Sequence, residues 1–547
     1  MHALCRCAIQ YSFPPRRSQK CIGVIGLAAN QLRTKTNIRD DVCAAEPSRR
    51  LRLLRALHTW IVLLLLTAGA AMLFGARWFL HTWPFLSVDE MKFHMNAPIT
   101  GTDPDIVRSG VLNVVVPAAA VFVIGVAVYA LGKKLRRQKR AAAMLAAAGA
   151  LTLVIGTGSL WHHLNLTSYF IYGHIPSELI EAEYVAPESA HIRFPAQKRN
   201  LIYIFLESME ITFADKDSGG AFKRNVIPEL TNIALSNECF AGNTGVLNGA
   251  HQSTGSGWTA GGMFAQSSGL PFPSSLGNNV KVRNNAFLPE VVALGDVLKD
   301  AGYRCVLMVG SDAEFGWRGY YYRSHGDYSI LDYPFFLSTG DLPKGYAVWW
   351  GYEDEKLFSF ARNELLTLCK ADRPFALTLL TVDTHFEDGY VCRRCSTSFG
   401  SDQYSNVMAC SSRQLASFLR WCSQQDFYKN TTIVLCGDHL TMDSDYCAKV
   451  SPKYDRRVYT AIINADVTPV LDKARVYFTL DLFPTTLTAI GAEFDGDRLG
   501  LGTDLYSDSP TLAEEYGINA INSEFYKYSE TLHRLTDWDS EDAGMDG

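Results

Sequence analysis

The sequence predicts an α/β protein with a mostly parallel sheet and helices on both faces, preceded by an N-terminal bundle of about three transmembrane helices. Three observations lead to this prediction. Three apolar stretches, each long enough to cross a bilayer, lie before residue 162. From residue 200 onward, short apolar strands alternate with helical stretches, which is typical of a parallel α/β sheet. Glu, Asp or His follows several of these strands, where α/β proteins commonly form their sites.

The composition fits a large folded protein with a membrane part. Of 547 residues, 48% are hydrophobic and 20% charged, which excludes global disorder, a collagen-like repeat and a small disulfide scaffold. The net charge of −5 averages two unlike parts, because the residues after 140 hold 31 basic and 49 acidic side chains. A domain with this excess of acidic residues repels the phosphate backbone of a nucleic acid, so we expect no nucleic-acid partner.

The apolar stretches are residues 57–76, 111–132 and 141–161. A membrane-spanning helix needs about 20 such residues, and each stretch reaches that length. The alternative is a set of buried helices in a soluble protein. It is disfavoured because the three stretches follow one another closely and basic clusters flank them. We therefore expect a transmembrane region over residues 51–165.

Basic clusters predict the topology, because Lys and Arg are enriched in cytoplasmic loops. One cluster, at 49–55, precedes the first span, and another, at 133–140, separates the second from the third. With both inside, the loop 81–110 and everything after about residue 162 lie outside. Residues 1–50 are interpreted as a disordered cytoplasmic tail or as an upstream extension from a misplaced start codon. We expect no cleaved signal peptide.

The outer part is expected to begin with a juxtamembrane linker over 166–199 that contains one short helix. A globular α/β domain then spans 200–508. Apolar runs predict its strands at 201–206, 303–309, 375–382, 432–436 and 458–463. Helices are predicted between them at 290–301, 352–369 and 406–424. The acidic segment 509–547 is expected to pack loosely as a C-terminal tail.

Nine cysteines lie in this outer part, and Cys392, Cys395, Cys410 and Cys422 fall within one irregular region. Outside the cytoplasm we expect one or two disulfides there. The alternative is a zinc or redox site at Cys392-x-x-Cys395. It is disfavoured because a second matching Cys-x-x-Cys is missing from the sequence.

Three residues that follow strands have the chemistry of metal ligands. Glu207, Asp438 and His439 offer two carboxylates and an imidazole, which suit Mn²⁺, Mg²⁺ or Zn²⁺. A hydroxyl bound to such an ion becomes a nucleophile. The candidate is Thr259, which lies among small residues in the run Gly255-Ser-Gly-Trp-Thr-Ala-Gly-Gly, where a helix start would favour an anion. Taken singly, a threonine in such a loop or a glutamate after a strand is more often structural.

Several motifs together resemble the alkaline phosphatase/sulfatase superfamily. They are Asn200-LIYIFLES-Met209, Gly257-WTAGGMFAQSSGLP-Phe272, Leu380-TVDTH-Phe386 and Val434-LCGDHLTM-Asp443. They are most similar to its phosphoglycerol transferase branch, which holds lipoteichoic acid synthases and the enzymes that add phosphoglycerol to periplasmic glucans. The likeness to the glucan-modifying enzymes extends to Leu86-SVDEMKFHMNAPITGTD-Pro104, Gly316-WRGYYYRSHG-Asp327, Asp481-LFPT-Thr486 and Arg498-LGLG-Thr503.

The resemblance implies that one divalent cation is held by four residues, Glu207, Thr259, Asp438 and His439. Mn²⁺ is the expected ion, with Mg²⁺ or Zn²⁺ as alternatives. Thr259 would be the nucleophile that becomes covalently substituted. The sulfatase motif Cys/Ser-x-Pro-x-Arg has no match near Thr259, and no convincing ligand set for the second metal of alkaline phosphatases is found in the sequence.

The resemblance also implies a substrate site. His385 would contact the substrate phosphate and serve as an acid or a base. The glycerol phosphate head group would be bound in the region of Asp312, Trp317 and Arg318. Arg323 is the rival for the basic role in that region.

The function implied is that of a phosphoglycerol transferase in the bacterial inner membrane, with its catalytic domain on the extracytoplasmic side. It would move glycerol phosphate from phosphatidylglycerol to an envelope glycan or polymer through a covalent threonine intermediate. The alternatives within the superfamily are a phosphoethanolamine transferase and a phosphodiesterase, and the alternative of another class is a non-catalytic binding or sensor domain. The acceptor stays open, because Ser256-Gly-Trp before Thr259 differs from the glucan-modifying enzymes and three spans are fewer than lipoteichoic acid synthases usually have.

Overall fold

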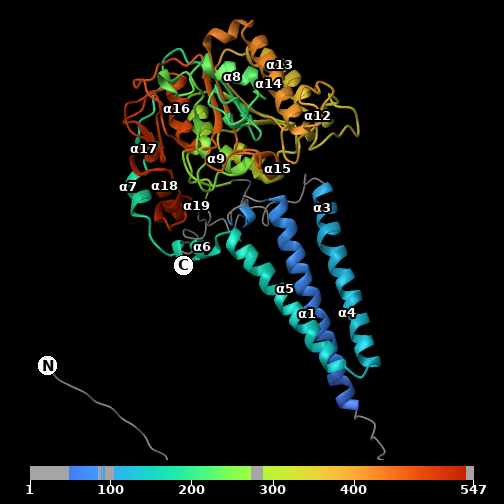
Figure 1. The fold of residues 1–547 in the computed structure, drawn as a ribbon. Helices are drawn as coiled ribbons and strands as arrows, with labels where there is room; N and C mark the ends of the chain where they lie inside the picture. Colours follow the sequence, from blue (N-terminus) through green and yellow to red (C-terminus); the bar gives the residue numbers. More distant parts are fainter. Residues whose placement is uncertain (1–48, 84–87, 89, 93–103, 273–286, 537–547) are drawn as a thin grey trace, which may run out of the picture. The chain divides into compact units, whose positions relative to one another are not determined.

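The computed structural model describes residues 49–83, 88, 90–92, 104–272 and 287–536, and Figure 1 shows its elements along the chain. The chain divides into two units, residues 1–57 and 58–547. The described part of the first unit is the start of the helix α1 (Arg49–Thr82), and the second unit holds the rest of α1 and every other described element. The expected cytoplasmic tail up to residue 48, much of the expected loop 81–110 and residues 537–547 lie outside the described residues.

Three long apolar helices confirm the predicted N-terminal bundle. Stretches long and apolar enough to cross a membrane run over Leu53–Thr82, Ile106–Lys134 and Gln138–His163. The second is continuous through α3 (Pro104–Gly110), a π-helical turn (Val111–Val115) and α4 (Val116–Lys134), and the third is α5 (Gln138–His163). Glycine lets α1 and α5 approach closely, since a Cβ on Gly149 would lie 2.7 Å from the backbone nitrogen of Leu66.

A seven-stranded sheet forms the centre of the globular region, in the order β2-β7-β6-β1-β5-β3-β4. The pairs along β6-β1-β5-β3-β4 are parallel, and β7 is antiparallel to both of its neighbours. The strands are β1 (Asn200–Leu206), β2 (Gly249–Ala250), β3 (Arg304–Val309), β4 (Ser329–Leu331), β5 (Phe375–Leu380), β6 (Thr431–Gly437) and β7 (Val458–Ile463). A separate pair is formed by β8 (Arg498–Leu499) and β9 (Gly502–Thr503). All five predicted strands are present.

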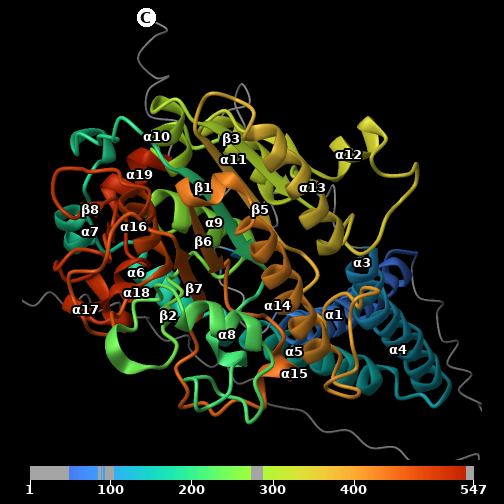
Figure 2. The ribbon, with the colours of Figure 1, turned by 90° about the horizontal axis from the view of Figure 1, so that it is seen from above.

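Helices cover both faces of the sheet, as predicted, and Figure 2 shows them around the strands. The side chains of β1 alternate between two hydrophobic cores, because successive residues of a strand point to opposite faces. The core that contains Tyr203 takes residues from α9 (Thr259–Ser268), α10 (Leu294–Asp300), α11 (Arg318–Ser324) and α16 (Leu482–Ala489). The core that contains Ile204 takes residues from α8 (Pro228–Leu235), α12 (Tyr333–Thr339), α13 (Asp354–Leu368), α14 (Gln403–Cys422) and α15 (Ser444–Cys447).

The C-terminal segment packs more tightly than expected. In place of a loosely packed tail after residue 508, it forms α17 (Leu512–Tyr516), α18 (Ile518–Glu524) and α19 (Glu530–Thr536). Leu512, Ile521 and Phe525 are buried in the same core as Tyr203. Acidic residues alternate with these apolar ones in the sequence and make the segment acidic on average. One side of each helix is nevertheless apolar.

The expected linker over 166–199 is also more structured than predicted. It contains two α-helices, α6 (Leu166–Tyr172) and α7 (Glu178–Glu183), where one was expected. Ser177 caps α7 by accepting a hydrogen bond from the backbone N–H of Ile180 at 3.2 Å. Ile180 is fully buried in the core that contains Tyr203, so this segment belongs to the globular region.

The nine cysteines of the globular region are free thiols in the described structure, in place of the one or two disulfides expected. The sulfur of Cys392 lies 3.7 Å from that of Cys395 and 3.7 Å from that of Cys410. Cys392 therefore has two equally close neighbours and no single partner.

Candidate functional site

The ends of β1 and β6 bring two carboxylates together. The strands pair in parallel with Leu206 opposite Gly437, so the residues that follow, Glu207 and Asp438, emerge side by side. Glu207, Asp438 and His439 are buried, and their ligand atoms all lie within 4.8 Å of one another. Nε2 of His439 is 3.5 Å from Oε1 of Glu207 and 3.4 Å from Oδ2 of Asp438. The three side chains thus converge on one point, and we call them the carboxylate–histidine cluster.

Hydrogen bonds hold the cluster in place. Nδ1 of His439 donates to the carbonyl oxygen of Leu440 at 2.8 Å, so Nε2 faces the carboxylates. Ser208 donates its backbone N–H to Oδ1 of Asp438 and its hydroxyl to Oε1 of Glu207, each at 2.8 Å. No described residue donates a hydrogen bond to the buried Oδ2 of Asp438. A buried carboxylate oxygen of this kind is available to a cation.

The charges of the cluster also favour a cation. Burial and the nearby Glu207 carboxylate raise the pKa of Asp438 above its usual range. Burial alone would raise the pKa of Glu207, but the hydrogen bond from His439 and the charges of His385 and His439 outweigh it and lower that pKa. Burial opposes protonation of His439, yet the two carboxylates overcome this effect and raise its pKa. Two carboxylates and an imidazole, with one carboxylate oxygen that accepts no hydrogen bond from a described residue, can hold a divalent metal ion.

The helix α9 brings Thr259 to the cluster. Thr259 is the first residue of α9, and its hydroxyl donates to Oε2 of Glu207 at 3.3 Å. This approach requires glycine at position 262, because a Cβ there would lie 2.0 Å from the carbonyl oxygen of Asp438. Gln266 also donates to the end of β6, at 2.9 Å. The positive end of the helix dipole therefore lies beside Thr259.

His385 lies on the segment that follows β5. The hydroxyl of the preceding Thr384 donates to the carbonyl oxygen of Glu207 at 2.6 Å and fixes the segment against the end of β1. Nδ1 of His385 donates to the carbonyl oxygen of Phe386 at 2.7 Å, and the ring centroid lies 4.8 Å from that of Trp350. Burial lowers the pKa of His385, although the charge of Glu207 opposes this. The neutral ring then leaves Nε2 as a proton acceptor.

Arg318 is buried within the electrostatic reach of the cluster. Its guanidinium donates to the hydroxyl of Ser311 and to the carbonyl oxygen of Asp312, each at 3.0 Å. Burial lowers its pKa to about 10, against the opposing effect of Glu207 and Asp312. The side chain remains a cation at neutral pH.

The contacts described for the other residues of the expected head-group region are with residues outside the cluster. The carboxylate of Asp312 accepts a hydrogen bond from the backbone N–H of Glu314 at 2.9 Å. Trp317 is buried and packs against Phe287, with ring centroids 5.3 Å apart. Arg323, the rival basic residue, forms an ion pair with Glu314 and is 41% exposed. Of the two arginines, Arg318 is the one coupled to the cluster.

Several residues that shape the site were not predicted. Ser208 and Thr384 adjoin predicted site residues, and their place inside the quoted motifs could have indicated them. Glu210 is fully buried and is bound by Nε of Arg456 at 3.0 Å. Arg456 carries no indication in the sequence, because the pairing depends on how distant segments meet. Trp350, in a pair of tryptophans, could only have been noted as an aromatic residue.

The fold and this site define a class of protein. The chain belongs to the Sulfatase family, whose model matches residues 199–492. Phosphoglycerol transferase I of Xanthomonas axonopodis pv. citri (strain 306) is 32% identical over 352 residues, which cover 63% of this chain and 48% of that protein. The protein of the same name from Salmonella arizonae (strain ATCC BAA-731 / CDC346-86 / RSK2980) is 31% identical over 315 residues, covering 56% of this chain and 39% of that one. The chain thus spans about half the length of such relatives, or less.

Solved structures are also similar. The lipoteichoic acid synthase LtaP from Listeria monocytogenes matches with a TM-score of 0.46 and 19% identity, covering 61% of this chain and 82% of that one. The family match and the relatives confirm the resemblance of the sequence motifs to this superfamily and its phosphoglycerol transferase branch. The family match and the structure confirm the predicted fold class, a mostly parallel, sulfatase-like sheet with helices on both faces, preceded by long apolar helices.

Proposed function

We propose that this chain is a membrane-anchored, metal-dependent phosphoglycerol transferase that acts on phosphatidylglycerol. One observation carries the proposal: the Thr259 hydroxyl, at the start of a helix, lies 3.3 Å from a carboxylate of the buried carboxylate–histidine cluster. The similarity to phosphoglycerol transferase I supports glycerol phosphate as the transferred group. The acceptor would be a hydroxyl of an envelope glycan or polymer.

The cluster would hold one divalent cation. Glu207, Asp438 and His439 supply the ligands, with the Thr259 oxygen as the fourth. Mn²⁺ is our first choice, and Mg²⁺ or Zn²⁺ suits the same donors. When bound, the ion would lower the pKa of the Thr259 hydroxyl and stabilise negative charge on the phosphate oxygens.

The reaction would run in two steps. In the first, the Thr259 oxygen attacks the phosphorus of phosphatidylglycerol, the bond from phosphorus to the diacylglycerol oxygen breaks, and diacylglycerol leaves with a proton. In the second, an acceptor hydroxyl attacks the phosphorus, loses its proton and releases Thr259. His385, neutral at rest, would take the Thr259 proton on Nε2 and give it to the diacylglycerol oxygen in the first step. In the second step it would take the proton of the acceptor hydroxyl and give it to the Thr259 oxygen.

Positive charge would hold the phosphate during both steps. The buried guanidinium of Arg318 and the N-terminus of α9 are two such sources among the described residues near the cluster. We place the glycerol head group against Asp312 and Trp317, which precede Arg318 on the segment between β3 and α11. This assignment is supported by the proximity of these residues in the chain and by the electrostatic attraction between Arg318 and Glu207.

The membrane helices would keep the enzyme at the surface that holds its donor. Apolar side chains on these helices, such as Val123, Met144 and Val154, are exposed in the described structure, as expected for helices that face lipid. Sharing a surface raises the effective concentration of the lipid at the site. We propose the bacterial inner membrane, with the catalytic domain on the extracytoplasmic side.

The test is to trap the covalent intermediate. Detergent-purified protein is incubated with phosphatidylglycerol vesicles and Mn²⁺, and modified peptides are mapped by mass spectrometry. We expect a phosphoglycerol adduct on Thr259 that disappears in Thr259→Ala. Thr254→Ala is the matched control, because the Thr254 hydroxyl bonds to Asn522 and not to the cluster.

Three outcomes would contradict the proposal. Turnover of Thr259→Ala near that of the unaltered protein would exclude Thr259 as the nucleophile. An adduct formed only from phosphatidylethanolamine would indicate a phosphoethanolamine transferase. Release of glycerol phosphate to water, with no acceptor product from any envelope fraction, would indicate a phosphodiesterase.

A further inference from the structure

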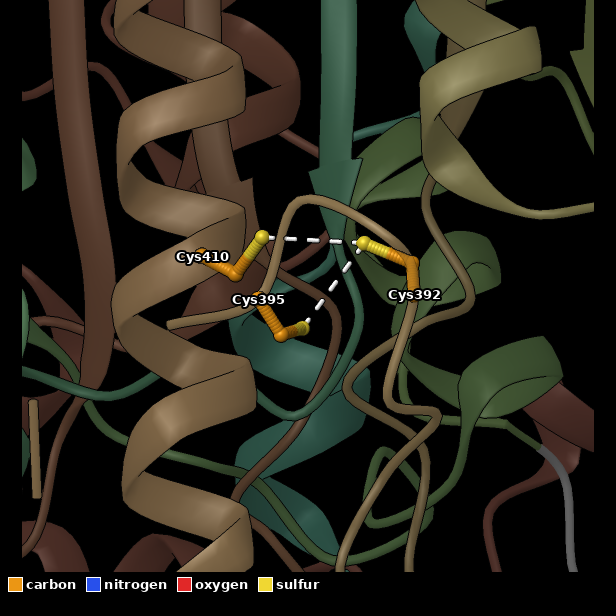
Figure 3. Close-up of side chains that lie close together, drawn as sticks. All are labelled: Cys392, Cys395 and Cys410. Carbon is orange, nitrogen blue, oxygen red and sulfur yellow. Dashed lines mark hydrogen bonds between the residues drawn. The ribbon is translucent and has the colours of Figure 1, made fainter. Parts of the chain in front are cut away.

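A group of three thiols lies apart from the carboxylate–histidine cluster. Cys392 and Cys395 lie on the segment between β5 and α14, and Cys410 lies on α14 itself, as Figure 3 shows. Cys392 and Cys410 are buried, and Cys395 is half-buried. All three sulfurs lie within 4.8 Å of one another. We call this group the thiol triad.

The spacing of the sulfurs matches a metal site. Cys392 is 3.7 Å from each of the other two sulfurs. A tetrahedral zinc ion with Zn–S bonds of about 2.3 Å separates its sulfur ligands by about 3.8 Å, the edge of that tetrahedron. Two of the three sulfur–sulfur distances match this edge and the third is at most 4.8 Å, so the three sulfurs can bind one ion after a small movement of the side chains.

The polar groups around the triad are hydrogen-bond donors. The side-chain amide of Gln414 lies 3.8 Å from the sulfur of Cys392 and 3.6 Å from that of Cys410. Backbone N–H groups of Arg394 and Cys395 also donate to the sulfur of Cys392. N–H groups directed at sulfur favour the thiolate, which is the form that binds metals.

We propose that Cys392, Cys395 and Cys410 form a second metal site, which binds Zn²⁺ through three thiolates. Among the described residues the group has three members, so water or an exchangeable anion takes the fourth position, reached from the exposed side of Cys395. Binding releases one proton from each thiol as its sulfur–zinc bond forms, and nothing is oxidised or reduced. The argument for this site does not rest on the proposed transferase activity.

Such an ion would join two parts of the chain. The segment 381–402 carries both His385 and the first two cysteines, and α14 carries the third. Gly389 already lies close to this helix, since a Cβ there would be 2.8 Å from a side-chain carbon of Val407. Zinc would therefore fix the loop of His385 to α14, which suits a structural site.

The test uses Co²⁺ as a spectroscopic substitute for zinc. The full-length protein, purified in detergent without reductant, is stripped of metal and titrated with Co²⁺. We expect thiolate-to-cobalt charge-transfer absorption in the near ultraviolet, which carboxylate and imidazole ligands do not give. Cys410→Ser should lose the band, and Cys395→Ala provides a second variant if that protein fails to fold.

Two controls separate the triad from other sites. Cys369→Ser removes an exposed thiol elsewhere and should leave the band unchanged. Asp438→Asn removes a ligand of the other cluster and should leave it unchanged as well. Before stripping, the unaltered protein should contain one more equivalent of zinc than Cys410→Ser. Absence of the band in the unaltered protein would overturn the proposal, and so would a mapped disulfide between Cys392 and either neighbour.

Discussion

The two histidines of the site make the same kind of hydrogen bond through Nδ1. In His439 and in His385, Nδ1 donates to a neighbouring backbone carbonyl, at 2.8 Å and 2.7 Å. That bond turns Nε2 away from the backbone in both rings. The surroundings then separate their roles. His439 faces two carboxylates and suits a ligand, whereas His385 lies beside Trp350 and suits proton transfer.

The role of His385 leads to a prediction at this scale. His385→Gln should slow release of diacylglycerol from phosphatidylglycerol by about 10²–10⁴-fold, because an amide cannot exchange the proton. The metal content should stay unchanged, since His385 lies outside the proposed ligand set. Both are measured on the purified protein, by lipid chromatography and by elemental analysis. His191→Gln is the control, because His191 is exposed and pairs with Asp495. Loss of metal together with activity would indicate a structural role.

At the scale of elements, a pair of carboxyls joins the start of α13 to the end of β5. Asp354 begins α13, and its carboxylate accepts a hydrogen bond from the backbone N–H of Val382 at 2.7 Å. Asp383 in turn accepts one from the backbone N–H of Asp354 at 3.1 Å. Burial raises the pKa of both carboxyls, and their mutual repulsion raises that of Asp383 further. The folded protein therefore retains a proton here that the unfolded chain has lost.

This retained proton makes stability depend on pH. A carboxyl with a raised pKa stabilises the fold at low pH, and this contribution is lost as the pH rises from the ordinary value of about 3.9 through the raised one. We expect the apparent Tm to fall between pH 6 and pH 9, with up to about 1.4 kcal/mol lost per pH unit for each proton. Asp383→Asn should flatten this dependence, and the exposed Asp217→Asn should not. Equal slopes in all three proteins would contradict the assignment.

The elements also show what the sequence could predict. Five strands were predicted from runs such as Leu201–Leu206 and Val458–Ile463, because these runs are apolar and long enough to show a strand pattern. The two- and three-residue strands β2 and β4 are too short for any pattern and were missed. Placing Glu207 and Asp438 after strands located them at the sheet edge. Glu207 and Asp438 lie side by side because β1 pairs with β6, and this pairing could not be predicted from the sequence.

Long-range partners were beyond sequence reasoning for the same reason. The ion pair of Glu210 with Arg456 and the burial of Phe525 depend on segments that meet only in the folded chain. The expected disulfides are absent among the described cysteines, where the sulfur of Cys392 lies 3.7 Å from those of Cys395 and Cys410. The proposed roles of Thr259 and His385 remain predictions, supported by where the residues lie.

At the scale of the whole molecule, the proposed orientation in the membrane can be tested. The six basic residues of 133–140 should lie in the cytoplasm and the catalytic domain outside. A fluorescent protein that matures only in the cytoplasm should be fluorescent when fused after Arg136. A phosphatase that folds only outside should be active when fused to the C-terminus of the full chain. The reverse pattern would contradict the orientation, and with it the access of the site to an outer-leaflet donor.

The alternation of β1 between two cores limits how this protein can change over evolution. Leu201, Tyr203 and Phe205 supply one core, and Ile202, Ile204 and Leu206 supply the other. An inserted or deleted residue in β1 would exchange the two sets and turn Glu207 to the wrong face. An exchange of one apolar side chain for another would only reshape a core. We therefore expect β1 to vary in side-chain shape across related genes, while its length stays fixed.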